Sequence, residues 1–486
     1  MRTWSWAPLV IVCSLLPAPR SLAGQDVERG RQLYDRWCSG CHGDTGAGDG
    51  DAAGYMLPRP RDFTGAVYQI RTTATGELPT DDDLRAVIDD GMPGTAMPGW
   101  AGKLSGRQRD DVIAYIKTFS RFFDGGEPEQ ISMGRQPGRG RPSEDDLAEG
   151  RRLFVEELQC SDCHGMQGRG DGTSARELTD DWGFPIRATD LTRNWNFNGG
   201  GTVEDIYTRM RTGLDGTPMP SQSDAVDAGV ITDEQLWRVA QYVHSLSLSP
   251  DGPPQRRDVV RAALFEGPLP SGPDDPLWDD VEPYYIPMVG QITIKPRWFA
   301  PTVDGIWVQA AHDNQNLAVK LSWSDATQSP DPDWDPFFQG IIRTLAAADT
   351  AHLTEQGPDR IGVQFPLEPP EGIQLPFFLG GDVRQPVYMW QWTSAPDQVR
   401  EGTAVGLGTF AANAGSPEVS HAATFSDGRW QLQFTRALAA SDPSLGVSFT
   451  PGEPLPMAFY AADGTDGEDA VRGSISAWYA IYLDVP

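Results

Sequence analysis

Two copies of a Cys-x-x-Cys-His pentad constrain this chain of 486 residues more than any other feature. The first reads CSGCH and begins at Cys38, and the second reads CSDCH and begins at Cys160. In such a pentad the two thiols add across the vinyl groups of a haem, and the adjacent imidazole ligates its iron. The sequence therefore predicts two covalent haem c groups. The predicted attachment residues are Cys38, Cys41, His42, Cys160, Cys163 and His164.

The surroundings of the pentads repeat at an offset of 122 residues, from Cys38 to Cys160, which indicates an internal duplication. Glycine, threonine, methionine and proline positions recur without a net gap as far as Pro98 in the first copy. A Cys-x-x-Cys pair can also form a redox disulfide or half of a zinc site. The repeat argues against both alternatives, because the pentads consume every cysteine after Cys13.

Each predicted haem iron needs a second axial ligand, because the histidine fills only one axial position. Met97 and Met219 each lie 55 residues after the histidine of the same copy, in a proline-rich loop before a predicted helix. A thioether is a soft ligand that raises the potential relative to bis-histidine ligation. Met92 is the nearest competitor, but the second copy has Leu214 there. The expected metal ligands are His42, Met97, His164 and Met219.

This pattern resembles class I cytochrome c over residues 25–120, here called the first unit, and again over residues 147–248, the second unit. The resemblance lies in a helix that leads into each pentad (VERGRQLYDRWCSGCH and LAEGRRLFVEELQCSDCH) and in a closing helix (SGRQRDDVIAYIKTF and TDEQLWRVAQYVHSL). Apolar residues of the closing helices recur at helical spacing. Arg59, Arg61 and Arg187 are candidate partners for haem propionates, and surface solvation explains each of them equally well.

Residues 1–23 have the form of a secretory signal peptide. Arg2 precedes an apolar run from Ala7 to Leu16, and Ala23 ends a small-residue cleavage site. The apolar run is too short to span a bilayer, and no later segment approaches a transmembrane length, so we expect no membrane span in the mature chain. The expected location is the periplasm, where c-type haem is attached.

The chain has a formal charge of −29, with 68 acidic residues against 39 basic ones. This balance argues against nucleic acid as a partner and would repel anionic membrane surfaces. It would also steer a basic redox partner, but an acidic solvated surface explains it equally well. Charge alone therefore does not select the partner.

Residues 121–146 and 249–276 are polar and rich in glycine and proline, which is typical of linkers. Beyond them, residues 277–486 change to short alternating runs rich in β-branched and aromatic residues. The candidate strands are QITIKP, GIWVQAAHD, LAVKLSWSD, RIGVQFPL, VYMWQW, HAATFSDGRWQLQFTR, LPMAFYAAD and ISAWYAIYL. The predicted fold is therefore multidomain, with two all-α cytochrome c domains followed by an all-β antiparallel sandwich.

The succession GIWVQAAHDNQNLAVKLSWSDAT, PVYMWQW, DGRWQLQFTRAL and MAFYAADGTDGED resembles the haem b-binding γ subunit of ethylbenzene dehydrogenase. Such subunits accompany molybdenum enzymes of the dimethyl sulfoxide reductase family. The resemblance implies a methionine and a lysine as haem b ligands. Leu379 stands at the methionine position, and Arg472 and Gly473 stand where the lysine is expected. None of these can ligate iron, so we expect this domain to have lost haem b or to bind it by another ligand pair.

Five other residues of the C-terminal domain have side chains that can ligate iron, but packing in the core or a place on the surface explains them more simply. These are Met389, Met457, His312, His352 and His421. We therefore keep them out of the predicted sites.

Together these features predict a periplasmic dihaem c-type cytochrome that relays single electrons as a non-catalytic partner or subunit of a molybdenum oxidoreductase complex. The implied partners are molybdoenzyme catalytic and iron-sulfur subunits and a soluble or membrane electron carrier. One alternative is a carbohydrate- or ligand-binding sandwich with Trp334, Trp390 or Trp392 exposed in a groove. A dihaem peroxidase is less favoured, because it needs an open or displaceable iron site and each unit supplies a candidate sixth ligand.

Overall fold

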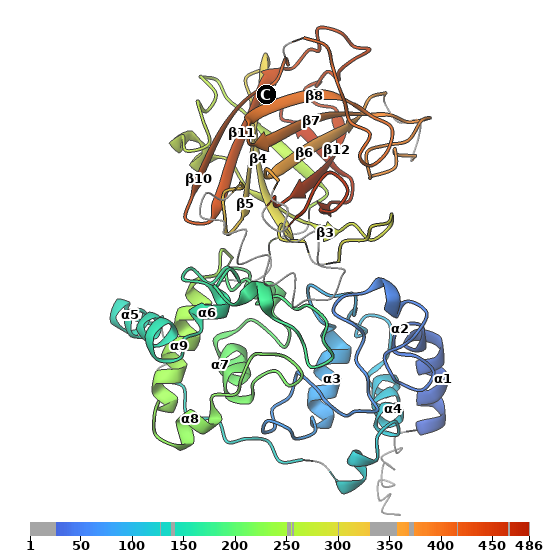
Figure 1. Cartoon of the computed structure of the whole chain (residues 1–486), viewed down its shortest axis with the longest axis vertical. Helices are drawn as coiled ribbons and strands as arrows, with labels where there is room; N and C mark the ends of the chain where they lie inside the picture. Colours follow the sequence, from blue (N-terminus) through green and yellow to red (C-terminus); the bar gives the residue numbers. More distant parts are fainter. Residues whose placement is uncertain are drawn as a thin grey trace, which may run out of the picture.

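The computed structural model describes residues 26–126, 128–137, 141–249, 254, 257–299, 301–330, 357–368, 374–415, 417–464 and 467–485. The two helical units lie side by side, and the C-terminal sheet domain, called the sandwich, lies against both (Figure 1). The predicted signal peptide, residues 1–23, falls outside the described residues. Within the described residues, no helix combines the length and the apolar character that crossing a membrane requires.

The first unit is a set of helices that begin at side-chain caps. It contains α1 (Val27–Trp37), α2 (Ser39–His42), η1 (Ala53–Tyr55), α3 (Asp81–Asp90), α4 (Gly106–Lys117) and η2 (Arg121–Gly125). Thr80 and Ser105 form capping boxes that satisfy amides left free in the first turns of α3 and α4. α1 crosses α4 at Gly30, where any side chain would overlap the carbonyl of Asp111. This close crossing sets the direction in which α1 leads into the pentad.

The second unit repeats this arrangement. It contains α5 (Glu144–Arg152), the π-helical turn η3 (Leu153–Glu157), α6 (Ser161–His164), η4 (Ala175–Glu177), η5 (Asn194–Asn196), α7 (Val203–Thr212), α8 (Ser223–Asp227) and α9 (Asp233–Ser245). Gly150 of α5 lies against the carbonyl of Arg238 in α9, as Gly30 does against α4. Tyr207 and Trp237 stack at 3.9 Å between ring centroids in its core. The predicted helical character of both units is confirmed.

The sandwich is a mainly antiparallel sheet that folds back on itself. Its elements are β1 (Val259–Leu264), η6 (Pro276–Asp280), β2 (Tyr284–Pro287), β3 (Val289–Gly290), β4 (Gly305–His312), β5 (Asn316–Ser324), β6 (Arg360–Pro366), β7 (Val387–Ser394), β8 (Asp397–Ala404), β9 (Ala411–Ala412), β10 (Ser420–Ser426), β11 (Arg429–Ala437), β12 (Pro454–Ala462), β13 (Ser474–Ile475) and β14 (Tyr479–Leu483). The main strand order is β10-β11-β5-β4-β1-β14-β12-β6-β7-β8-β9.

β12 joins the two layers of the sandwich. Its first half, up to Met457, pairs with β14, and its second half pairs with β6. The two layers then face each other across an aromatic core, in which Trp392 of β7 lies 4.8 Å from Trp430 of β11 and 6.0 Å from Trp323 of β5, between ring centroids. These large rings hold the layers together, because burying aromatic side chains contributes strongly to stability.

The sheet differs from the expectation in two places. β1 lies inside the stretch 249–276 that we expected to be a linker, and it pairs in parallel with β4 and β14, so the sheet is mixed and begins before residue 277. The segment QITIKP is a turn and not a strand. The side chain of Gln291 accepts from the Ile294 amide at 2.7 Å and donates to its carbonyl at 2.8 Å, which folds the chain back locally.

Candidate functional site

In the first unit the pentad spans the end of α1 and the single turn of α2. The Nδ1 atom of His42 lies 2.9 Å from the carbonyl oxygen of Arg61, and its ring stacks on Phe63 at 4.6 Å between ring centroids. Because a carbonyl can only accept, Nδ1 carries the proton and Nε2 keeps a free lone pair. Burial lowers the pKa of His42, which favours the neutral imidazole that iron ligation requires.

The second pentad has the same chemistry. The Nδ1 atom of His164 lies 2.9 Å from the carbonyl oxygen of Thr189, and burial lowers the pKa of this histidine too. The two cysteines of each pentad are not joined by a disulfide, so both sulfur atoms can form thioether bonds. Burial raises the pKa of Cys38 and of Cys160 to about 12. Each unit therefore presents two reduced thiols beside an imidazole whose Nε2 can ligate.

Met97 and Met219 lie in loops that close through the same internal hydrogen bonds. The amide five residues before each methionine donates to the methionine carbonyl, at 3.0 Å in the first unit and 3.1 Å in the second. The amide of each methionine donates to a threonine hydroxyl two residues earlier, at 3.1 and 3.3 Å. The duplicated sequence therefore produces a duplicated loop that holds a thioether at the same place in each unit.

The predicted haem-binding residues of the two units line one continuous cavity of about 2210 Å³. They are Cys38, Cys41, His42, Met97, Cys160, Cys163, His164 and Met219. Pockets for a single small molecule measure roughly 300–1,000 Å³, so this cavity has room for more than one large ligand. Two thiols, a neutral imidazole and a thioether in each unit suit a covalently held haem, so the residues fit the predicted group. Met92 lines the cavity as well.

The three arginines that the sequence offered as propionate partners, Arg59, Arg61 and Arg187, also line this cavity. The guanidinium of Arg61 lies 4.9 Å from the ring centroid of Trp182, and that of Arg59 lies 5.0 Å from the ring centroid of Phe184. Both aromatic residues belong to the second unit. A loop of the second unit therefore packs across the pocket of the first.

The sandwich supplies part of the cavity wall, which the sequence did not indicate. Trp298 and Thr302 line the cavity, and the guanidinium of Arg187 donates to the Thr302 hydroxyl at 3.1 Å. Behind them lies the buried carboxylate of Glu468, which accepts from the Trp298 indole at 2.6 Å and from the Thr302 amide at 2.9 Å. Burial raises the pKa of Glu468 to about 7.

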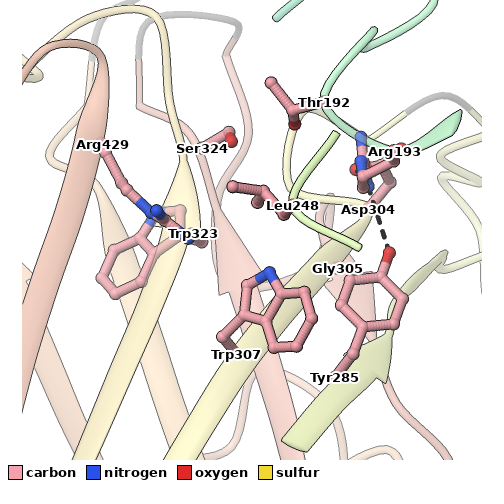
Figure 2. Close-up of a pocket in the computed structure, with 10 residues that line it drawn as sticks. All are labelled: Thr192, Arg193, Leu248, Tyr285, Asp304, Gly305, Trp307, Trp323, Ser324 and Arg429. Carbon is pink, nitrogen blue, oxygen red and sulfur yellow. Dashed lines mark hydrogen bonds and ion pairs between the residues drawn. The ribbon is translucent and has the colours of Figure 1, made fainter. Parts of the chain in front are cut away.

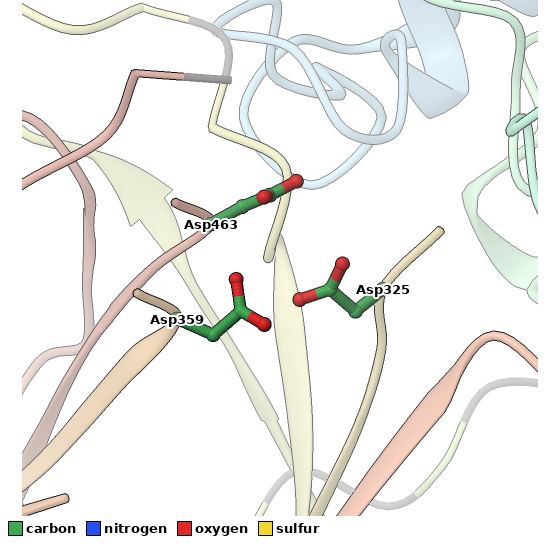
Figure 3. Close-up of side chains that lie close together, drawn as sticks. All are labelled: Asp325, Asp359 and Asp463. Carbon is green, nitrogen blue, oxygen red and sulfur yellow. The ribbon is translucent and has the colours of Figure 1, made fainter. Parts of the chain in front are cut away.

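Three buried aspartates, Asp325, Asp359 and Asp463, gather where the sandwich faces the units (Figure 3). Their carboxylate oxygens lie within 4.8 Å of one another, and two of the three line the cavity. Asp359 accepts hydrogen bonds from two backbone amides, at 2.8 and 3.0 Å, and from the Trp430 indole at 3.0 Å. Burial raises the pKa of Asp359 to about 6, so this group holds its proton at higher pH than an exposed aspartate does.

The positions where the γ-subunit resemblance expects haem b ligands have structural roles in this chain. Leu379 is 1% exposed and belongs to a small core with Tyr460 and Ile475. The guanidinium of Arg472 pairs with Asp469 at 2.7 Å.

The other candidate donors and aromatic residues are also engaged. His312 contacts the Asp484 carbonyl at 2.9 Å, and His421 contacts the Asp397 carboxylate at 2.8 Å. Four residues are buried within β7 and β12, namely Met389, Met457, Trp390 and Trp392. Two further candidates lie outside the described residues, namely His352 and Trp334. The alternative in which Trp390 or Trp392 lies exposed in a groove is therefore wrong.

The two units match two different protein-family models. Residues 25–116 match the family described as cytochrome c oxidase, cbb3-type, subunit III, and residues 147–247 match the cytochrome c family. The chain contains two cytochrome c domains. They give it an electron-transfer function and imply one covalent haem c in each domain.

Three proteins named for redox complexes are similar to parts of this two-domain cytochrome. One, named for a respiratory nitrate reductase heme subunit (ORF7) of Haloferax mediterranei, is 27% identical over 226 residues, which are 46% of this chain and 72% of that protein. Subunit CcoP of the cbb3-type cytochrome c oxidase of Rhodobacter capsulatus is 27% identical over 227 residues, which are 45% of this chain and 61% of that protein. A chain from a reducing HAO-like protein complex of Kuenenia stuttgartiensis is 42% identical, with 46% of this chain and 97% of that chain covered and a TM-score of 0.42.

Proposed function

We propose that this protein is a periplasmic dihaem cytochrome c that relays single electrons between the members of a redox complex. The observation that carries the proposal is the shared cavity, in which both pentads and both methionine loops meet. A bound haem c supplies a one-electron ferric/ferrous couple. The two cysteines of each unit would hold it covalently, and the histidine together with Met97 or Met219 would ligate its iron.

The surrounding residues support a relay and not a substrate reaction. The carbonyls of Arg61 and Thr189 hold the two imidazoles neutral and oriented. With methionine as the second ligand, neither iron would have an open position, and the residues of both haem sites line one continuous cavity. The chain would therefore pass electrons from one unit to the other while its own ligands stay in place.

We further propose that the sandwich attaches the relay to a molybdenum oxidoreductase complex. Support comes from the resemblance of the sandwich to haem b-binding γ subunits and from a relative named for a nitrate reductase heme subunit. The packing of Leu379 and the ion pair of Arg472 favour a sandwich without haem b, so its role would be docking. Expression beside candidate molybdoenzyme subunits, followed by affinity purification of the full chain, tests this assignment.

The first experiment on the relay is a pyridine haemochrome spectrum combined with acid extraction of non-covalent haem. We expect two haem c groups per chain and no extractable haem b. Fewer than two haem c groups would overturn the dihaem assignment, and one extractable haem b would overturn the loss of the third site.

Axial ligation is tested by Met97→Ala and Met219→Ala. Each should abolish the near-infrared methionine–iron absorption band of one haem and lower its potential, because the soft thioether favours ferrous iron. Met92→Leu is the matched control, since the second unit has Leu214 at that position, and it should change neither band. Peroxide turnover with a high-spin signal in the unaltered protein would favour the dihaem peroxidase instead.

A further inference from the structure

The loop that carries Met219 is held by the first cytochrome c domain. Asp215 lies in this loop, four residues before the methionine. One guanidinium nitrogen of Arg71, from the first unit, donates to the Asp215 carboxylate at 2.7 Å and to the Thr212 carbonyl at 2.8 Å. The amide of Gly76, also from the first unit, donates to the other Asp215 oxygen at 2.9 Å. Both oxygens of this carboxylate are therefore bound by the neighbouring domain.

This contact is buried and its hydrogen bonds are satisfied. The side chain of Arg71 is 0% exposed and that of Asp215 is 16% exposed. The other two guanidinium nitrogens of Arg71 donate to carbonyl oxygens within the first unit. Nε donates to Ala74 at 3.1 Å, and Nη1 donates to Tyr68 at 3.2 Å. Removing one partner of a buried ion pair leaves an uncompensated charge, so the pair resists separation. The Met219 loop cannot move outward without breaking these bonds.

The loop that carries Met97 lacks an equivalent contact. Its internal hydrogen bonds match those of the Met219 loop, but Pro93 stands where the second unit has Asp215. Arg193, which is the equivalent of Arg71 in the second unit, pairs with Asp304 of the sandwich. Among the described residues, no hydrogen bond joins the loop 92–98 to the second unit or the sandwich. The two methionine loops therefore have the same internal hydrogen bonds, but only the Met219 loop is also bonded to a neighbouring domain.

We propose that Arg71 is a positioning residue for Met219, so that the first domain controls how firmly the axial methionine of the second haem is held. The inference rests on the proposed ligation by Met97 and Met219. Movement of the loop away from iron would displace Met219, and the bonds from Arg71 and Gly76 oppose that movement. Met97 packs against the core of its own unit but has no hydrogen bond to its loop from another domain among the described residues, so it is the more exchangeable of the two ligands.

The test is an imidazole titration of the oxidised full-length protein. The loss of the near-infrared methionine–iron absorption band measures how much methionine the imidazole has displaced. In a Met97→Ala background this band reports Met219 alone. We expect Arg71→Met in this background to raise the apparent imidazole affinity of the second haem at least tenfold. Asp215→Asn, which preserves the shape of the side chain, should raise it in the same direction by a smaller factor. Arg193→Met is the matched control, because it removes the equivalent arginine without touching the Met219 loop, and it should leave the affinity unchanged.

Two results would overturn the inference. One is an equal imidazole affinity in Arg71→Met and Arg193→Met. The other is an equal loss of the Met97 and Met219 bands in the single variant Arg71→Met, which would indicate general loosening. If the Met97→Ala protein shows no methionine–iron band at all, the proposed ligation by Met219 fails first and the inference falls with it. If the band is present and Arg71 has no effect on it, only the inference fails.

Discussion

Arg71 and Arg193 occupy the same position in the two cytochrome c repeats, 122 residues apart, and each forms an ion pair with the domain that follows it. Arg71 pairs with Asp215 of the second unit at 2.7 Å. Arg193 pairs with Asp304 at the edge of the sandwich, and its guanidinium also donates to the Tyr285 hydroxyl at 3.2 Å (Figure 2). One duplicated arginine therefore links the first unit to the second and the second unit to the sandwich.

The second of these links predicts how the sandwich is attached. The side chain of Arg193 is 11% exposed and that of Asp304 is 47% exposed, so the guanidinium side of the pair is shielded from solvent. A double-mutant cycle with Arg193→Met and Asp304→Asn, measured by urea unfolding, should give a coupling energy of roughly 1–3 kcal/mol. The control cycle uses Arg261 and Asp484, a pair within the sandwich whose arginine is 57% exposed, for which roughly 0.2–1 kcal/mol is expected. Equal coupling in both cycles would contradict a structural role for Arg193.

The aspartate cluster predicts a pH dependence of sandwich stability. Burial raises the pKa of Asp359 to about 6 in the folded protein, from an ordinary value of 3.8, so the folded state binds this proton more tightly than the unfolded state does. The free energy of unfolding should therefore fall as pH rises from about 4 to about 6, by up to about 3 kcal/mol for this group. The neighbouring carboxylates that face it are Asp325 and Asp463.

Asp359→Asn isolates that contribution, because an amide does not titrate in this range. The variant should lose part of the decline that the unaltered protein shows between pH 4 and pH 7. Urea unfolding followed by tryptophan fluorescence at intervals of one pH unit measures the effect. Parallel pH profiles for the two proteins would contradict the prediction.

Glu468 predicts a pH-dependent reduction potential. Its buried carboxylate contacts Trp298 and Thr302, which line the haem cavity, and its pKa lies at about 7. An electron added in the cavity makes protonation of a nearby carboxylate more favourable, so at least one midpoint potential should fall as pH rises through 7. The limit for one proton per electron is about 59 mV per pH unit. The positive charge of Arg187 favours the ionised form of Glu468, and the backbone amide of Asp463 donates to its carboxylate at 2.9 Å.

Spectroelectrochemical titrations between pH 5 and pH 9 measure this slope. Glu468→Gln should flatten it near pH 7, while Glu453→Gln, which alters an exposed glutamate of the sandwich, should leave it unchanged. A slope that survives in Glu468→Gln would assign the proton to another group, such as a haem propionate.

Local chemistry decided which parts of this protein could be predicted from sequence. The position of the two pentads and the two matching methionine loops could be predicted, because the duplicated motifs have fixed residue types at fixed spacing, and ligation by Met97 and Met219 stays a prediction. β8 was missed because Asp397–Ala404 is polar, and its strand conformation depends on pairing with β7. The sandwich wall of the cavity was also missed, because contacts between domains leave no local pattern. Arginines at equivalent positions of both repeats, Arg71 and Arg193, were the one available signal of the links between domains.

The proposed absence of haem b from the sandwich should not be reversed by introducing the two ligands that the γ-subunit resemblance implies. Leu379→Met conserves volume and should cost less than about 1.5 kcal/mol, but the side chain would remain packed against Tyr460 and Ile475. Gly473→Lys should cost about 1–3 kcal/mol, because a Cβ atom there would lie 2.5 Å from the Ala461 carbonyl oxygen. Acid extraction of the double variant should therefore yield no haem b, with thermal unfolding and the two haem c spectra as controls for folding. One extractable haem b per chain would instead show that only the two ligands had been lost and that the pocket itself remains.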